Sequence, residues 1–150
     1  MANISDYPVK AGWSGGRGGA GHVATSDGHV DCDLAVPVEF KGPGNAANPE
    51  QLLTCAVASC YVITFGIIAE NRKLPVESLE LEAVGHVDVS TMLPKYIGVT
   101  LRPTIRVKAP TEEQKVTILD MAHKAETYCI VTNALRETVE ITIEPTIVEV

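Results

Sequence analysis

Residues 52–69 contain no charged residue over 18 positions. That length is at the lower limit of what can span a bilayer. The run is diluted by Thr54, Ser59 and Thr64, and it has no aromatic belt and no flanking cluster of lysine or arginine. The pattern therefore favours a buried helix over a membrane span.

The start of this helix is marked by three residues. Asn48 can act as the N-cap, Pro49 suits the first helical position, and Gln51 stands where it can close a capping box. A helix that is apolar on all sides has to be covered on all sides. We expect a second subunit to provide part of that cover. A sheet on one side with short helices on the other is the alternative that the pattern leaves open.

Alternation of apolar and polar residues predicts strands in the remaining chain. A hairpin is expected around residues 30–36, because Asp27 and Gly28 form a turn signal just before them. Three further segments alternate with period two, at residues 79–89, 97–107 and 139–143. Pro103 falls inside one of them and predicts a bulge or an edge strand there.

A second helix is predicted from Thr111, which with Gln114 forms another capping box, to about Glu126. Tight turns and alternating faces favour antiparallel sheets, so the expected class is α+β, with antiparallel sheets packed around a buried central helix. At 150 residues without a linker or repeat, the chain is expected to form a single domain over residues 1–150.

Charge narrows the possible partners. With 12 basic and 19 acidic residues, the formal net charge is −7, which argues against nucleic acid and anionic membranes as partners. Residues 1–21 contain no apolar segment of the kind found in secretory signals. A cytoplasmic location is expected.

Four cysteines provide the candidate chemistry: Cys32, Cys55, Cys60 and Cys129. Cys32 lies on the apolar face of its predicted strand and is expected to be inert. Cys55 and Cys60 are five positions apart, about 140° around a helix, so they cannot bridge each other. Cys129 lies beyond the second helix in a turn-like stretch, where a thiol has freedom to move. It is the best partner for a reactive cysteine.

A reactive cysteine must be ionised, and a free thiol is only a few per cent ionised at neutral pH. Cys60 is twelve residues from Asn48, too far along its helix for the N-terminal dipole to act. Arg72 is about 18 Å further on. We therefore expect the stabilising cation to come from another segment.

Arg17 is the candidate cation, because it stands alone among the glycines of residues 15–19, whose backbone can approach a site closely. Glu50 could hold its guanidinium by a bidentate pair. The alternative for Arg17, judged by itself, is a solvated loop charge.

Neither of two possible cofactor motifs fits its surroundings in the sequence. Gly16, Gly18 and Gly21 match G-x-G-x-x-G, but they precede a hairpin signal rather than opening a helix. The four histidines form no paired spacing with the cysteines that would predict zinc. No cofactor and no metal are therefore expected.

Taken together, several short motifs resemble the family of osmotically inducible protein C and the organic hydroperoxide resistance proteins (OsmC/Ohr). They are Gly15-Gly16-Arg17, Asn48-Pro49-Glu50-Gln51-Leu52, Ala58-Ser59-Cys60, and Cys129 followed by Thr132-Asn133-Ala134. The resemblance runs from about Gly15 to the end, and the N-terminal half is more similar to the hydroperoxide resistance subgroup. One departure is Ile130, where the family usually has proline.

The resemblance implies a thiol-dependent peroxidase that reduces organic hydroperoxides, alkyl or fatty-acid, to alcohols. In this reading Cys60 is the peroxidatic thiol, Cys129 the resolving thiol, and Arg17 with Glu50 the activating pair. It also implies an intertwined homodimer with sites at the interface, and a dithiol reductant such as a lipoylated protein.

Spacing adds one expectation. Glu50 and Cys60 are ten residues apart, about 15 Å along a straight helix, so Glu50 of one subunit could serve Cys60 of the other. Apolar lining of the pocket is expected from Tyr61, Ile63, Phe65 or Met92. The rival hypothesis is a non-catalytic dimer that binds small ligands and whose pocket thiols are incidental.

Overall fold

The computed structural model describes residues 1–150. The chain forms two compact units, Met1–Leu52 and Leu53–Val150, and each is described by itself. The expectation of a single domain over the whole chain stays a prediction.

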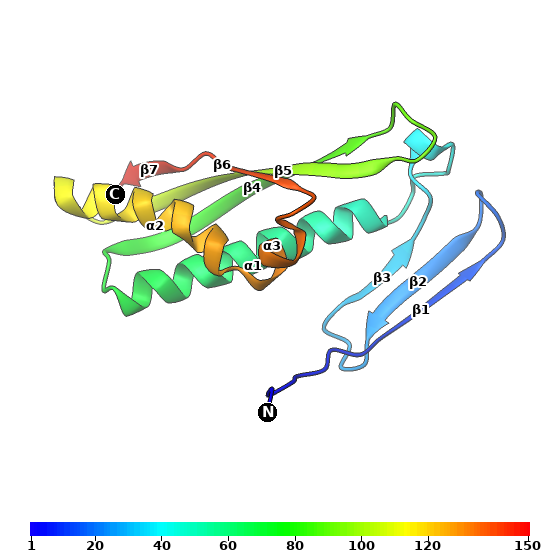
Figure 1. Ribbon diagram of the computed structural model, residues 1–150, viewed down its shortest axis with the longest axis horizontal. Helices are drawn as coiled ribbons and strands as arrows, with labels where there is room; N and C mark the ends of the chain where they lie inside the picture. The colour runs from blue at the N-terminus through cyan, green and yellow to red at the C-terminus, as the bar shows by residue number, and fades with distance from the viewer. The chain divides into compact units, whose positions relative to one another are not determined.

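The first unit is built around an antiparallel three-stranded sheet in the order β1-β2-β3 (Figure 1). Its strands are β1 (Val9–Ser14), β2 (Ala20–Thr25) and β3 (Asp31–Leu34), followed by a short 3₁₀ helix, η1 (Val38–Phe40). The hairpin between β2 and β3 confirms the predicted one. Gly28 in its turn has φ of 75°, a conformation that glycine adopts without steric cost.

The second unit contains three helices and a four-stranded sheet (Figure 1). After α1 (Pro49–Asn71), whose first turn belongs to the first unit, the elements are β4 (Val76–Asp88), β5 (Lys95–Val107), α2 (Glu112–Tyr128), α3 (Ile130–Leu135), β6 (Glu140–Ile143) and β7 (Thr146–Glu149). β4 and β5 pair antiparallel, whereas β6 and β7 both pair parallel with β5. The α+β class is confirmed, with one antiparallel and one mixed sheet.

Pro103 lies in the middle of β5, which is a central strand and not an edge. Proline has no N–H to donate, so a strand paired along its whole length on both sides would lack one hydrogen bond at this residue. On one side β6 covers β5 as far as Leu101, and β7 resumes at Thr104. Pro103 therefore falls at the break between two partner strands, and the prediction of an edge or a bulge at this residue was wrong.

A bulge does occur in β5, six residues earlier. His86 of β4 pairs with Gly98 and Val87 pairs with Tyr96, so Ile97 is the extra residue. Ile97 is consequently exposed, although its position in the alternation predicted an inward side chain. Tyr96 takes the inward position, where its hydroxyl lies 2.8 Å from Oγ1 of Thr54 on α1.

The core of the second unit lies between α1, α2 and one face of the sheet. α1 buries one side chain per turn against this core: Val57, Tyr61, Phe65 and Ala69. The Tyr61 hydroxyl donates a hydrogen bond to the Ala122 carbonyl at 2.6 Å, which satisfies the only polar atom of that side chain inside the core. Burial raises the pKa of Tyr61. These contacts fix the rotation of α1 about its own axis.

The predicted capping box of α1 is present. The Gln51 N–H donates to Oδ1 of Asn48 at 2.9 Å, and Oε1 of Gln51 accepts from the Asn48 N–H at 3.3 Å. The helix begins at Pro49, as predicted, and ends two residues after the uncharged run.

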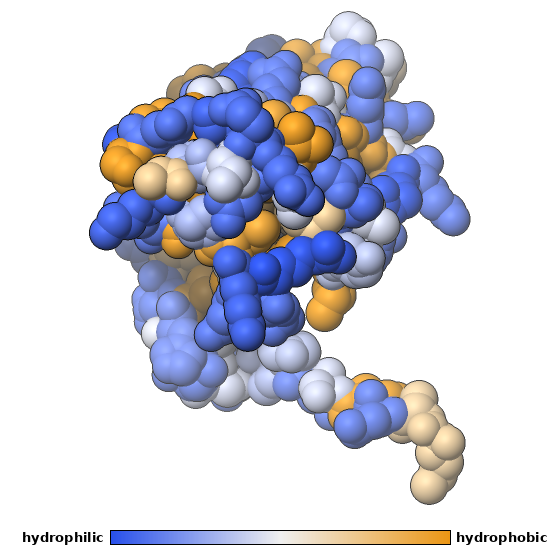
Figure 2. Space-filling model, turned by 90° about the vertical axis from the view of Figure 1, so that its left-hand side faces the viewer, coloured by the Kyte–Doolittle hydropathy of each residue, from blue (hydrophilic) through white to orange (hydrophobic).

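A second stripe of α1 is not covered within the second unit. It consists of Cys55, Ser59, Ile63 and Ile67, each one turn from the next, and Ile63 is 62% exposed and Ile67 53%. By length and composition alone α1 could cross a membrane, but a helix at the centre of a folded core passes the same test. Hydrophilic residues make up most of the surface drawn in Figure 2, with hydrophobic residues between them.

Candidate functional site

Cys60 lies on a third side of α1, between the core stripe and the exposed stripe. Thr64 is one turn further along the same side, and its hydroxyl hydrogen-bonds the Cys60 sulfur. The other groups that bond this sulfur come from the start of α3: the Cys129 thiol and the N–H groups of Ile130 and Val131. The fold therefore brings Cys60 and Cys129 together from positions 69 residues apart.

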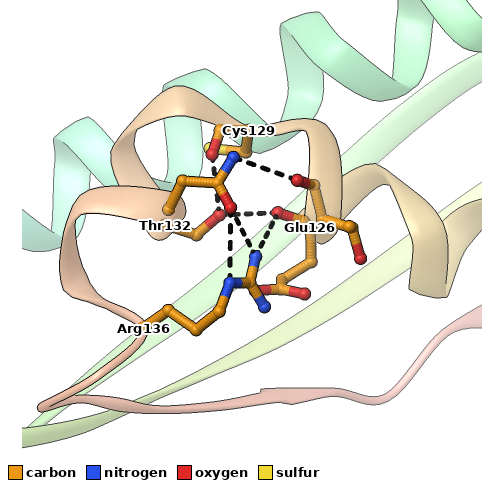
Figure 3. A network of polar contacts seen from close by, with 6 residues as sticks. Glu126, Cys129, Thr132 and Arg136 are labelled. Carbon is orange, nitrogen blue, oxygen red and sulfur yellow. Dashed lines mark hydrogen bonds and ion pairs between the residues drawn. The ribbon is translucent and has the colours of Figure 1, made fainter.

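Cys129 is the single residue between α2 and α3 (Figure 3). It is at once the C-cap of the first helix and the N-cap of the second, with φ of −74° and ψ of 121°. Its side chain is fully buried. The prediction of a turn-like stretch with freedom to move was therefore wrong, because the chain enters α3 directly after this cysteine.

Two opposing effects set the pKa of the Cys60 thiol. Burial, the larger single effect, raises it, while the hydrogen bonds from Cys129, Val131 N–H, Thr64 and Ile130 N–H lower it. The bonds together outweigh burial, so the pKa of Cys60 lies below its ordinary value. The first N–H groups of a helix have no partner within the helix, so a thiolate at α3 satisfies donors that would otherwise be unpaired.

The pKa of Cys129 moves in the other direction. Burial raises it first, and the hydrogen bond to Cys60 raises it further. In this pair Cys60 therefore ionises at lower pH than Cys129, and its thiolate accepts a hydrogen bond from the Cys129 thiol. Such an arrangement offers a nucleophile on one sulfur and, within hydrogen-bonding distance, a second sulfur able to form a disulfide with it.

The donors to Cys60 were not predicted from the sequence, which indicated a cation from another segment. Thr64 could have been found, because it is four residues from Cys60 on a predicted helix. The two N–H groups could not, because the segment after Cys129 carries no helix signal of its own.

Arg17 and Glu50 belong to the first unit. Arg17 lies at the tip of the β1–β2 hairpin, in a turn closed by the Gly19 N–H donating to the Gly16 carbonyl at 2.9 Å. Gly15 has φ of 85°, so the turn needs glycine there. Glu50 is in the first turn of α1. Their role as the activating pair stays a prediction.

The other predicted residues divide between the core and the surface. Tyr61 and Phe65 are part of the hydrophobic core, whereas Ile63 and Met92 are exposed. Which of them line a substrate pocket stays a prediction. Cys55 is exposed on α1, and Cys32 is partly exposed on β3. No group of three or more histidine, cysteine or carboxylate side chains is placed to hold a metal ion.

Comparison with known proteins decides the family. The model of the OsmC-like protein family matches residues 42–144. The chain belongs to the OsmC-like family. The uncharacterized protein YmaD of Bacillus subtilis is 30% identical over 98% of this chain and 97% of its own. An organic hydroperoxide resistance protein of Xanthomonas axonopodis pv. citri is 28% identical, over 91% of this chain and 92% of its own.

The fold of this OsmC-like chain is also that of solved members. The crystal structure of an organic hydroperoxide resistance protein OsmC from Legionella pneumophila has a TM-score of 0.76 and 28% identity, and the match covers 95% of this chain and 99% of that one. The predicted family and α+β fold are thus confirmed.

Proposed function

We propose that this OsmC-like protein is a thiol-dependent peroxidase that reduces organic hydroperoxides to alcohols. The observation that carries the proposal is the paired state of two cysteines from distant segments, one with a lowered and one with a raised pKa. Relatives of similar length that bear the name organic hydroperoxide resistance protein support the same activity.

The reaction has three balanced steps. The Cys60 thiolate attacks the terminal oxygen of the hydroperoxide, the O–O bond breaks, and the alkoxide leaves and is protonated to the alcohol. Cys60 is now a sulfenic acid, oxidised by two electrons. The Cys129 thiol condenses with it, releasing water and forming the Cys60–Cys129 disulfide. An external dithiol then reduces this disulfide and is itself converted to a disulfide. A lipoylated protein is the reductant that we propose.

A homodimer is part of the proposal. The uncovered stripe of α1, with Ile63 and Ile67, is the kind of apolar surface that monomeric proteins rarely leave open. In the dimer Arg17 and Glu50 act as the activating pair, with Glu50 serving Cys60 of either the same or the other subunit. We further propose a cytoplasmic location, where reductants keep the four thiols reduced between cycles.

The test is a count of free thiols after one equivalent of cumene hydroperoxide. We expect rapid loss of two thiols per chain with formation of one equivalent of cumyl alcohol. Cys60→Ser should abolish both, and Cys129→Ser should lose a single thiol and accumulate sulfenic acid. Unchanged thiols and intact peroxide would instead support a ligand-binding dimer with incidental cysteines.

A further inference from the structure

The junction that carries Cys129 is held by side chains that the proposed reaction does not use. Thr132, which is fully buried, places its hydroxyl 2.6 Å from the Glu126 carbonyl and 3.1 Å from the Cys129 carbonyl. Nδ2 of Asn133 donates to the Thr127 carbonyl at 3.0 Å. Side chains of α3 thus satisfy the last carbonyls of α2, which have no partner within their own helix.

Arg136 adds an ion pair with Glu126 to these contacts (Figure 3). Its Nη1 lies 2.8 Å from Oε1 of Glu126, and its Nη2 donates to Oδ1 of Asn133 at 2.8 Å. Nη2 also lies 3.4 Å from the Glu126 carbonyl. One guanidinium therefore contacts both Glu126, in the last turn of α2, and Asn133, the side chain of α3 that bonds the junction.

Glu126 is an unfavourable residue at its position unless it is paired. Its side chain is 11% exposed, so the carboxylate has lost most of its water. It also stands in the last turn of α2, where the helix dipole disfavours a negative charge. The ion pair with Arg136 offsets part of both costs, although no hydrogen bond reaches Oε1 of Glu126.

We propose that the ion pair between Glu126 and Arg136, together with Asn133, is a clasp that holds the Cys129 sulfur and the first N–H groups of α3 against the Cys60 sulfur. Glu126 and Arg136 are positioning residues, because they act through Cys129, Ile130 and Val131 and touch no reacting atom. The inference rests on the proposed function for its purpose, but the clasp can be measured without peroxide.

The experiment uses Glu126→Gln and Arg136→Gln in a background of Cys32→Ser and Cys55→Ser. Two quantities are measured: the equilibrium for disulfide formation between Cys60 and Cys129 against a glutathione buffer, and the pH dependence of Cys60 alkylation by iodoacetamide, read at its tryptic peptide. We expect the effective concentration of the two thiols to fall at least tenfold. The alkylation profile should shift to higher pH, since the N–H groups no longer face the sulfur.

Arg136→Lys keeps the positive charge, so both measured quantities should lie between those of the wild type and those of Arg136→Gln. The matched control is Asp120→Asn, which removes the exposed ion pair with Lys124 on the same helix and should leave both quantities unchanged. If either single variant fails to fold, Glu126→Gln with Arg136→Gln leaves no unpaired buried charge and answers the same question.

Wild-type values in both clasp variants, or equal changes in Asp120→Asn, would overturn the proposal. Because neither measurement uses a hydroperoxide, a protein that fails as a peroxidase still gives a result for the clasp. Conversely, an active peroxidase with an unaltered thiol equilibrium in both variants refutes the clasp alone.

Discussion

At the scale of single residues, the reactivity of Cys60 depends on uncharged donors close to its sulfur. Thr64, the Cys129 thiol and two N–H groups of α3 all bond it, and together they outweigh the effect of burial on its pKa. The thiolate should therefore persist to lower pH than that of an ordinary cysteine. Each donor can be removed separately, which makes its contribution measurable.

Ile130→Pro removes one of the N–H donors, since proline has none. Proline is well accommodated at the first position of a helix, so α3 should still form. We expect the pKa of Cys60 to rise and its alkylation at neutral pH to become slower. Ile130→Ala keeps the N–H and is the control. Identical pH profiles for the alanine and proline variants would show that this donor does not contribute.

Thr64→Val removes a hydroxyl donor while keeping the side-chain shape. The alkylation profile of Cys60 should again move to higher pH, because the thiolate loses a hydrogen bond and the neutral thiol loses little. Ser59→Ala is the matched control, because its hydroxyl bonds the Ala56 carbonyl on the same helix. A shift of equal size in the control would argue against a specific role for Thr64.

The sequence indicated both thiols of the site but misjudged their surroundings. Position on the apolar helix left Cys55 and Cys60 as alternatives, and the family resemblance selected Cys60, whereas Cys129 was indicated by its place after the second helix. The donors from α3 depend on how the chain enters this helix at Cys129, and the turn-like pattern of the segment did not predict a helix there. A bond from a backbone N–H to a sulfur on a distant segment requires no particular side chain at the donor residue.

At the scale of elements, capping boxes set where the two long helices begin. Thr111 accepts from the Gln114 N–H at 3.1 Å, and Gln114 accepts from the Thr111 N–H at 2.9 Å, as the sequence predicted. Local signals of this kind lie within four residues of each other, so they could be read without knowing the fold.

Thr111→Ala should lower the free energy of unfolding by about 1 kcal/mol, because the N-cap hydroxyl bond is lost. Thermal and urea unfolding, followed by circular dichroism, would measure it. Thr117→Ala is the comparison, since that hydroxyl bonds the Glu113 carbonyl within the helix and caps nothing. A smaller loss for Thr111→Ala than for Thr117→Ala would contradict the importance of the cap.

The sheets were only partly predictable. Alternation located β4, β5 and β6, but β1 contains Gly12 beside a glycine-rich turn and was not expected as a strand. β7 is four residues long, too short for a clear period. The parallel pairing of β6 and β7 with β5 joins residues about 40 apart in the sequence, and periodicity says nothing about which strands become neighbours.

At the scale of the whole molecule, the uncovered stripe of α1 should be the surface that a second copy covers. Ile63→Glu with Ile67→Glu is expected to weaken the dimer about 100-fold, because burying each isoleucine contributes roughly 1.5 kcal/mol or more. Analytical ultracentrifugation over a concentration series would measure this. Val116→Glu alters an exposed apolar residue on α2 and should have no effect. An unchanged dissociation constant in the double variant would place the interface elsewhere.

A shared site makes a separate prediction about activity. If Glu50 serves Cys60 of the other subunit, mixing inactive Glu50→Ala chains with inactive Cys60→Ser chains should restore activity in the heterodimers. About half of the mixed chains form heterodimers at equal concentrations, and each has one complete site, so recovery of up to about a quarter of the wild-type rate is expected. Rates that stay at the level of the separate variants would show that each chain supplies its own Glu50.

The order of the strands has a consequence for synthesis on the ribosome. The half of β5 that follows Pro103 gains its second neighbour only from Thr146–Glu149. While the chain is being translated, that half of the strand is an open edge, with unpaired groups that can template pairing with other nascent chains. Truncation before these residues would thus expose the protein to aggregation although α1, β4 and α2 are complete.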